Sequence, residues 1–345
     1  MGTTLITGGA GFTGANFAHG LLERGERVIV FDNLSRRGSE LNLEWLQGLD
    51  TPGQLEVIIG DVRQPPPELC GIVEESDALL HFAAQVAVTT SVADPRDDFE
   101  TNALGTLNML ELVRQSRGKR PVLCYSSTNK VYGGMEDLAT TADESRYRYL
   151  DLPLGIPEER SLDFHSPYGC SKGAADQYVR DYARIYGLDT IVFRQSCIYG
   201  PRQFGVEDQG WVAWFVIAAQ LGRPISIFGN GKQVRDVLFV EDLVSCYVDA
   251  VEARETCSGR VYNIGGGPEN AISLLDLLGF MGEQLGRPVP VTFGDWRPGD
   301  QPIYVSDIRR AATEYGWRPQ TGWREGVGRL WAWVHDHRDM LASLV

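Results

Sequence analysis

Residues 3–14 read TTLITGGAGFTG, in which a short β-rich run is followed by Gly8, Gly11 and Gly14. The apolar spacing after the last glycine is that of a helix, so the glycines lie between a predicted strand and a predicted helix. Glycine allows a tight turn and lets backbone amides approach a ligand without an intervening side chain. The first turn of the helix presents free amides and a partial positive charge. This stretch therefore predicts a loop that binds the pyrophosphate of a dinucleotide.

The first half of the chain repeats this alternation of strand and helix, which predicts a parallel sheet flanked by helices. We expect strands at Thr3–Thr7, Arg27–Phe31, Leu55–Ile59, Ala78–Phe82, Val122–Tyr125 and Thr190–Arg194, and helices at Ala15–Arg24 and Tyr168–Tyr186. Beyond residue 190, short strands mix with helices, and glycine, proline and tryptophan become frequent. The predicted fold class is α/β, a doubly wound parallel sheet (Rossmann type) with a smaller C-terminal α+β lobe. We expect residues 1–190 to form the dinucleotide-binding domain and residues 191–345 most of the second lobe, with a strand or helix returning to the first domain.

Acidic residues at two strand ends indicate which dinucleotide is bound. Asp32 closes the second predicted strand about 20 residues after the glycine loop, where a carboxylate can accept both ribose hydroxyls of adenosine. It would repel a 2′-phosphate, which favours NAD over NADP, although Arg36 and Arg37 stand where arginines can hold that phosphate. Asp61, at the end of the third strand, is expected at the adenine ring. The residues expected to bind NAD are Gly8, Gly11, Phe12, Thr13, Gly14, Asp32, Asn33, Ser35, Arg36, Asp61, Val62, Ala83, Ala84, Gln85, Asn102, Ser126, Tyr168 and Lys172.

Tyr168 and Lys172 are four residues apart, so they share one face of a predicted helix. Oxidation of a hydroxyl by hydride transfer needs a base, and tyrosine is a poor base at its ordinary pKa of about 10. A nearby ammonium and a positively charged nicotinamide favour the phenolate and lower that pKa. In isolation this spacing usually marks a surface pair, but here it follows the fifth strand of a dinucleotide fold. Thr128, after the carboxyl end of that strand, is expected to share a hydrogen bond with the reacting hydroxyl. The predicted catalytic residues are therefore Thr128, Tyr168 and Lys172.

Bulk composition excludes several other classes. A formal net charge of −14 disfavours nucleic acid and anionic membrane as partners, because both need a basic surface. The longest apolar stretch, Trp211–Leu221, is about half the length needed to cross a bilayer. Six cysteines are scattered without a Cys-x-x-Cys pair and no secretory signal opens the chain, so we expect reduced thiols and a cytoplasmic location. The His335-Asp336-His337 cluster falls in a predicted terminal helix, and we expect no metal site.

These motifs, in this order, resemble the extended short-chain dehydrogenase/reductase family, in particular its NAD-dependent nucleotide-sugar epimerases and dehydratases. Matches in the second half are Tyr199-Gly200-Pro201-Arg202, Arg235-Asp236 and Arg297-Pro298-Gly299-Asp300. The resemblance covers essentially the whole chain. It implies a nucleotide-sugar substrate, a homo-oligomer (dimer or tetramer) formed through the helix that bears Tyr168, and a transient keto sugar.

Arginines of the second half are candidates to anchor the nucleotide, with pairing to the many acids as the alternative. The residues expected to contact the nucleotide sugar are Thr128, Asn129, Lys130, Gln195, Arg202, Gln209, Arg235, Arg297 and Asp300.

Asn129 and Lys130 indicate which branch of the family this is. Dehydratases of the family carry an Asp-Glu pair directly after the catalytic threonine, and 4-epimerases commonly have small residues there. Residues 127–133, 163–178 and 208–211 resemble the epimerases that invert carbon 2 of a CDP-linked deoxyhexose. The alternatives are a nucleotide-sugar 4-epimerase, a dehydrogenase or decarboxylase that releases its product at the keto stage, and a non-catalytic NAD sensor. The sensor is disfavoured because Thr128, Tyr168 and Lys172 are all present.

Overall fold

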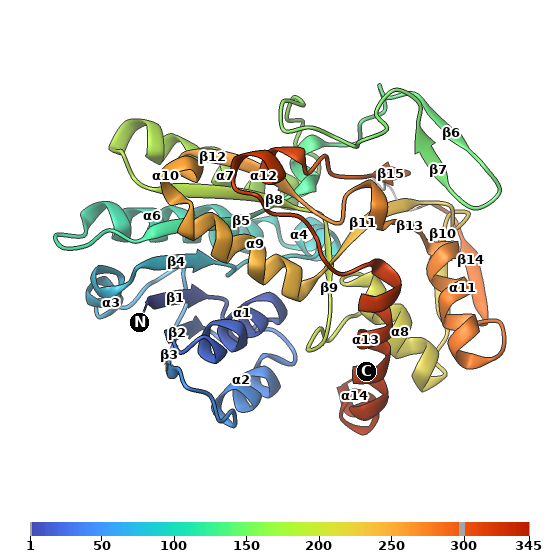
Figure 1. The fold of residues 1–345 in the computed structure, drawn as a ribbon, viewed down its shortest axis with the longest axis horizontal. Helices are drawn as coiled ribbons and strands as arrows, with labels where there is room; N and C mark the ends of the chain where they lie inside the picture. Colours follow the sequence, from blue (N-terminus) through green and yellow to red (C-terminus); the bar gives the residue numbers. More distant parts are fainter. Residues whose placement is uncertain (1, 297–300, 345) are drawn as a thin grey trace.

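The computed structural model describes residues 2–296 and 301–344, which form two lobes side by side (Figure 1). In this part of the chain, the first lobe is built on a seven-stranded parallel sheet of order β12-β8-β5-β4-β1-β2-β3. Its strands are β1 (Thr3–Thr7), β2 (Arg27–Asp32), β3 (Gln54–Ile59), β4 (Ala78–His81), β5 (Val122–Thr128), β8 (Thr190–Gln195) and β12 (Arg260–Ile264). The strand order reverses between β1 and β4, so a crevice is expected at their carboxyl ends.

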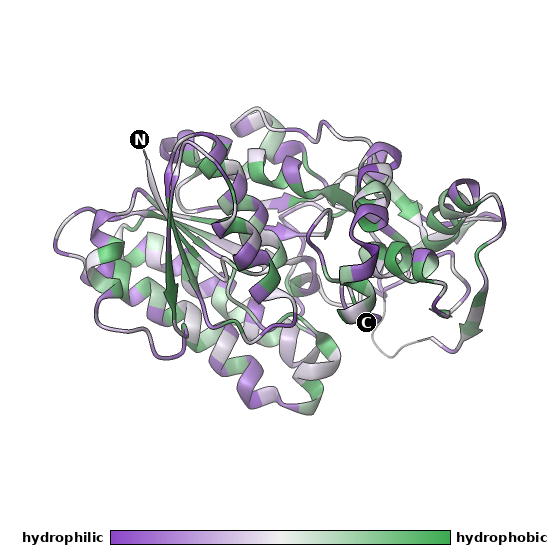
Figure 2. Ribbon diagram, turned by 90° about the horizontal axis from the view of Figure 1, so that it is seen from below, coloured by the Kyte–Doolittle hydropathy of each residue, from purple (hydrophilic) through white to green (hydrophobic). Residues whose placement is uncertain are grey.

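Helices cover both faces of this sheet. On one face, α1 (Phe12–Glu23) and α9 (Val240–Glu252) pack their apolar side chains onto the strands. On the other face lie α3 (Leu69–Glu75), α6 (Gly105–Gln115) and α7 (Ser166–Tyr186). Figure 2 shows apolar residues along the central strands between these layers. The predicted α/β class with a doubly wound parallel sheet is confirmed.

Smaller elements lie between these layers and at the edges of the two lobes; in Figure 1, α2 is at the lower edge of the first lobe, and β6 and β7 are at the upper right beside β15 (Ile303–Tyr304). They are α2 (Ser39–Gln47), α4 (Val88–Ala93), α5 (Pro95–Phe99), the π-helical turn η1 (Glu100–Leu104), the 3-10 turn η2 (Asn129–Tyr132), β6 (Thr140–Ala142) and β7 (Tyr147–Tyr149).

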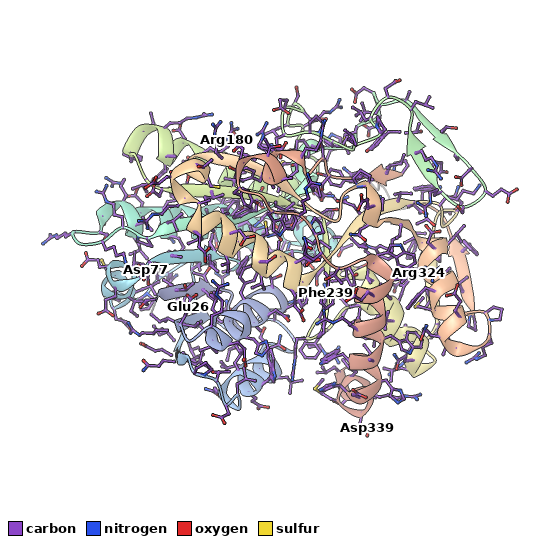
Figure 3. The ribbon with its side chains drawn as sticks, viewed as in Figure 1. Glu26, Asp77, Arg180, Phe239, Arg324 and Asp339 are labelled. Atoms are coloured by element: carbon purple, nitrogen blue, oxygen red, sulfur yellow. The ribbon has the colours of Figure 1, made fainter. Side chains whose placement is uncertain are left out.

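The second lobe has its own core, formed by α8 (Trp211–Leu221), α11 (Leu274–Leu285) and α13 (Trp323–Asp336) around short strands. Phe239, labelled in Figure 3, lies 4.4 Å from the guanidinium of Arg329 and joins β11 to α13. The other elements are β9 (Cys197–Tyr199), β10 (Ile225–Phe228), β11 (Val234–Phe239), α10 (Arg254–Cys257), η3 (Pro268–Asn270), β13 (Ala271–Ser273), β14 (Val291–Gly294), β15 (Ile303–Tyr304), α12 (Arg309–Glu314) and α14 (Arg338–Leu344). Among the described residues, no helix combines the length and apolar character that crossing a bilayer requires.

Element boundaries near the site differ from the prediction by two to three residues. α1 begins at Phe12 instead of Ala15. β5 continues to Thr128 instead of ending at Tyr125, because residues 126–128 pair with β8 in register. α7 begins at Ser166, ahead of Tyr168, with Pro167 in its first turn where a missing amide does no harm. Asn102 lies inside η1, which joins α5 to α6. Both β8 and β12, from beyond residue 189, belong to the first lobe's sheet.

A buried ion pair joins α7 to β8. Arg194 donates from Nε and Nη2 to the two oxygens of Asp176 at 2.8 and 3.0 Å, and the side chains are 2% and 0% exposed. The Oγ of Ser127 on β5 donates to the same carboxylate at 2.8 Å. The Asp176 carboxylate therefore links α7 to β5 and β8, whose carboxyl ends border the crevice.

We expect Asp176→Asn to lower the free energy of unfolding by about 3–5 kcal/mol, because it leaves the Arg194 guanidinium buried without a charge partner. The measurement is urea unfolding followed by circular dichroism. Asp181→Asn is the matched control, since Asp181 is exposed on the same helix. Equal stability of the two variants would contradict the assignment.

Candidate active site

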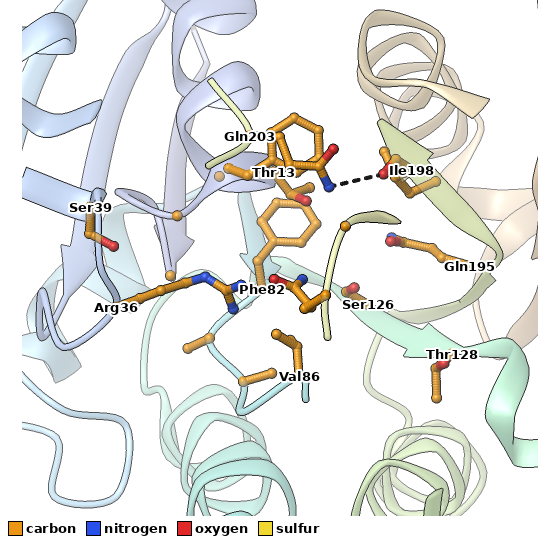
Figure 4. Close-up of a pocket in the computed structure, with 18 of the residues that line it drawn as sticks. Thr13, Arg36, Ser39, Phe82, Val86, Ser126, Thr128, Gln195, Ile198 and Gln203 are labelled. Atoms are coloured by element: carbon orange, nitrogen blue, oxygen red, sulfur yellow. Dashed lines mark hydrogen bonds between the residues drawn. The ribbon is translucent and has the colours of Figure 1, made fainter. Parts of the chain in front are cut away.

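A cavity of about 440 Å³ opens at the carboxyl ends of β1, β2, β4 and β5, between the two lobes (Figure 4). Its first-lobe wall contains the glycine loop, the β2–α2 loop and the ends of β4 and β5. Gln195, at the end of β8, and residues 196–198, 202–204 and 208–212 close it on the other side. Its volume is in the range of sites that hold cofactors and small substrates.

The glycine loop keeps its shape because Gly8 and Gly14 have no side chains. Gly8 has φ of +68°, and a Cβ there would lie 2.6 Å from the amide nitrogen of Ala83. A Cβ on Gly14 would lie 2.3 Å from the carbonyl oxygen of Gly8. Gly11 is the N-cap residue of α1 and makes no side-chain cap, so the first amides of the helix face the cavity without a competing side chain. The loop therefore fits a dinucleotide.

Asp32 stands at the end of β2, where the adenosine ribose would lie. One oxygen accepts from the amide of Ala10 at 3.0 Å and the other from the amide of Leu34 at 2.8 Å. Burial raises the pKa of this carboxyl group, and the backbone amides oppose that rise. The carboxylate is thus held in one orientation at the edge of the cavity.

Asp61, at the end of the loop after β3, also lines the cavity. The guanidinium of Arg63 donates to it at 2.7 Å and holds its pKa at about 2. The side chain of Asn33 donates to the same carboxylate at 2.9 Å, which links the two loops at this end of the cavity.

Tyr168 and Lys172 lie one turn apart on α7 and both line the cavity. Tyr168 lines the cavity together with Thr128, at the end of β5, and this threonine lowers the pKa of the tyrosine. Lys172 donates from Nζ to the carbonyl oxygen of Ser126 at 2.5 Å, and lies 4.4 Å from the ring centre of Tyr125. Burial lowers the pKa of Lys172 to about 7, which Asp98 and Asp176 oppose. The structure thus brings together all three predicted catalytic side chains.

Burial dominates the pKa of Tyr168 in the protein alone. The sequence predicts that Lys172 and a bound nicotinamide together lower this pKa, and without the cofactor burial raises it to about 12. The ammonium of Lys172 is turned toward Ser126 and the Tyr125 ring, and Thr128 has the largest lowering effect on the pKa of Tyr168. The positive nicotinamide ring of bound NAD is the additional cation that would favour the phenolate.

Most of the predicted site residues line this cavity. They are Gly8, Gly11, Phe12, Thr13, Gly14, Asp32, Asn33, Ser35, Arg36, Asp61, Val62, Ala83, Ala84, Ser126, Thr128, Asn129, Lys130, Tyr168, Lys172, Gln195, Arg202 and Gln209. Figure 4 shows Arg36 extending across the cavity toward Phe82.

Five predicted residues are placed otherwise or are not described. Gln85 and Asn102 are absent from the lining and are hydrogen-bonded to each other behind it. Arg235 lies on β11 outside the lining, and its Nη1 donates to the carbonyl of Val234 at 2.8 Å. Arg297 and Asp300 lie outside the described residues.

The sequence did not predict the residues that close the cavity beside the β2–α2 loop, where the adenosine of NAD would lie. Asn42 of α2 lines the cavity and donates to the carbonyl of Ala10 at 3.2 Å. Phe204 lines it from the second lobe, and its ring contacts Gly38 so closely that a Cβ would not fit there. The guanidinium of Arg202 stands 4.3 Å from the ring centre of Trp45, on α2. Gly38 after the two arginines was an available signal in the sequence. Phe204 and Arg202 left none, because they contact Gly38 and Trp45 across more than 150 residues.

These features define a dinucleotide-dependent enzyme with a Tyr/Lys/Thr site, and comparison with known proteins gives the family. Over residues 5–330 the chain matches the family described as GDP-mannose 4,6 dehydratase. The chain belongs to this family of NAD-dependent nucleotide-sugar epimerases and dehydratases. It is 46% identical, over 96% of its length and 98% of the relative's, to the CDP-paratose 2-epimerase of Salmonella typhi.

Two solved structures share the fold over nearly their whole length. The UDP-glucose 4-epimerase of Thermotoga maritima, solved with UDP-glucose, has a TM-score of 0.80 and 29% identity, covering 97% of this chain and 99% of that one. The dTDP-glucose 4,6-dehydratase of Streptomyces venezuelae, solved with NAD bound, has a TM-score of 0.82 and 27% identity, covering 99% and 100%. The predicted family and NAD dependence are confirmed.

We expect Asp32→Ala to weaken NAD binding about 10- to 100-fold, because a charge-assisted hydrogen bond of this kind contributes roughly 1.5–3 kcal/mol. Isothermal titration with NAD measures the change. Asp50→Ala, at an exposed position on the same lobe, is the control. An unchanged affinity in Asp32→Ala would remove this residue from the cofactor site.

Proposed function

We propose that this chain inverts carbon 2 of a CDP-linked deoxyhexose through a transient 2-keto sugar. The observation that carries the proposal is that Tyr168, Lys172 and Thr128 line one cavity with the cofactor loop, and that Asn129 and Lys130, which follow Thr128, line it too. The 46% identity to a CDP-paratose 2-epimerase supports the choice of sugar and carbon.

Three side chains of the cavity take part in proton transfer or support it. Tyr168 takes the proton of the 2-hydroxyl as general base and later returns it, and Thr128 shares the hydrogen bond throughout. Lys172 holds the cofactor ribose and keeps a positive charge beside the site. NAD, when bound, supplies hydride acceptance and return at the sugar carbon. Inversion requires that the keto sugar rotate about its pyrophosphate linkage and present its other face.

Asn129 and Lys130 argue against elimination of water. A dehydratase needs an acid and a base next to the catalytic threonine, and Asn129 can be neither. Lys130 points its Nζ toward the side-chain oxygen of Gln301, at 3.4 Å. We propose that both residues contact the sugar. A 4-epimerase and an enzyme that stops at the keto stage are the remaining alternatives, and the substrate experiment below separates them.

We propose that residues from the second half of the chain hold the nucleotide. Gln195, Gln209 and Arg202 line the cavity and would contact the substrate there. The roles of Arg235, Arg297 and Asp300 at the pyrophosphate and ribose are proposed from the sequence pattern. In this scheme residues 1–190 bind NAD, while residues 191–345 bind most of the nucleotide sugar and return β12 to the first sheet.

We further propose that the enzyme is a cytoplasmic homo-oligomer. Apolar side chains are exposed on α4, α5 and α7, which pack on one another, with Val92 65%, Phe99 55% and Tyr178 49% accessible. A second copy of the chain would cover this face. All six cysteines are free thiols, which supports a reducing compartment. Sedimentation of the wild-type chain and of Phe99→Glu tests the oligomer, and an unchanged mass in the variant would reject this face.

The experiment that tests the reaction is incubation with CDP-, UDP-, GDP- and dTDP-linked hexoses, followed by NMR of the sugar ring and by absorbance of NADH. We expect a new 2-epimer from a CDP-deoxyhexose without accumulation of NADH. Inversion at carbon 4 would indicate the 4-epimerase, and net NADH would indicate a dehydrogenase.

We expect Tyr168→Phe to lower the turnover rate by about 10²- to 10⁴-fold while NAD affinity stays within a factor of about three, because only the acid/base oxygen is removed. Steady-state kinetics and NAD titration measure both quantities. Tyr178→Phe, exposed on the same helix, serves as the control. A Tyr168→Phe variant that kept more than about a tenth of the wild-type rate would show that another group takes the proton.

A further inference from the structure

A buried carboxylate lies behind the catalytic pair. Asp98 of α5 is 1% exposed. Its oxygens accept hydrogen bonds from Gln85 Nε2 at 2.8 Å, from Asn102 Nδ2 at 3.2 Å and from Ser171 Oγ at 2.5 Å. Each of these side-chain groups can donate, so the set satisfies an ionised carboxylate.

The three donors come from three different elements. Gln85 follows Ala83 and Ala84, which line the cofactor cavity after β4. Asn102 belongs to η1 and also donates to the carbonyl of Gln85, at 3.0 Å. Ser171 lies on α7, between Tyr168 and Lys172. The carboxylate thus connects the catalytic helix to the loop that lines the cofactor site, through residues that do not themselves line the cavity.

The negative charge of Asp98 affects the pKa values of both Tyr168 and Lys172. It raises the pKa of Lys172, against the larger effect of burial. It also raises the pKa of Tyr168, in the same direction as burial. Other groups lie around this pair. Asp176 of α7, the Tyr125 ring of β5 and His81 of β4 act on Lys172 or are acted on by it, and burial keeps His81 neutral with a pKa of about 3. Arg36 of the β2–α2 loop and Thr128 of β5 lower the pKa of Tyr168.

We propose that Asp98 is a positioning residue for the catalytic pair, which orients α7 through Ser171 and keeps the Lys172 ammonium charged. The proposal rests on the proposed function, because it takes Tyr168 to be the base of that reaction. It also explains why Gln85 and Asn102 are present although neither lines the cofactor cavity: they hold the carboxylate.

The sign of the effect follows from the charges. Asp98→Asn keeps the shape of the side chain and removes the negative charge. The Tyr168 phenolate then loses a nearby like charge and forms more easily, so the pKa of Tyr168 falls. The Lys172 ammonium loses a nearby opposite charge, so its pKa falls too. Both limbs of the pH–rate profile therefore move to lower pH, whereas a variant that merely loosened the structure would lower the rate at all pH values.

The test follows Tyr168 directly in the NAD-bound enzyme. Tyrosine labelled with ¹³C at Cζ is titrated by NMR, and Tyr168→Phe assigns the signal. In Asp98→Asn we expect the Tyr168 titration to move down by about half a unit to one unit. Glu100→Gln is the matched control: it removes a charge two residues away whose side chain is 39% exposed, and we expect no shift. An unshifted Tyr168 signal in Asp98→Asn overturns the proposal.

A second variant tests the proposal if Asp98→Asn does not fold. Ser171→Ala keeps the carboxylate and removes its link to α7, together with the hydrogen bond that Ser171 Oγ accepts from Asn102, so we expect kcat to fall about 10-fold with NAD affinity unchanged. An unaltered kcat in Ser171→Ala overturns the positioning role. The NMR titration needs only NAD, so its result stands even if the chain converts no CDP-hexose, in which case the proposed function alone fails.

Discussion

The site depends on one buried carboxylate, Asp176, which accepts hydrogen bonds from Ser127 of β5 and Arg194 of β8. These contacts hold α7 against the end of a parallel sheet, and so place Tyr168 in the same cavity as Thr128. Ala175, Val179 and Tyr182 of the same helix add apolar packing against the sheet. The desolvation of the ion pair is offset only because the guanidinium fork and the serine satisfy the carboxylate.

The charged groups around α7 explain how Tyr168, a poor base at the ordinary pKa of tyrosine, can accept a proton. Burial raises the pKa of Tyr168 and lowers that of Lys172, so each side chain is pushed toward its neutral form. Asp98 and Asp176 oppose the second effect and keep a cation in the site. Binding of an oxidised nicotinamide then adds positive charge where the phenolate must form. In this account the protein keeps the base inactive until the cofactor is present in the oxidised form.

The parts of the fold that depend on local sequence were predictable. The glycine spacing of residues 8–14 and the alternation of strands gave the sheet and its cofactor loop, because both patterns are set by backbone geometry. The Tyr168/Lys172 spacing gave the catalytic helix for the same reason. Contacts between distant segments were not predictable: the hydrogen bonds that Gln85 and Asn102 donate to Asp98 leave no local pattern in the sequence. The effect of burial on the pKa of Tyr168 was not predictable either, because burial depends on packing that the sequence pattern does not contain.

The central claim is that the sugar is oxidised directly at the carbon that is inverted. The most direct measurement uses a CDP-deoxyhexose deuterated at carbon 2, converted in ordinary water and examined by NMR. Direct oxidation predicts that the product keeps the deuterium at carbon 2, because the hydride moves between sugar and cofactor without meeting solvent. Replacement of the deuterium by hydrogen from water would contradict the account, since it would require an enolate and a further base such as Lys130.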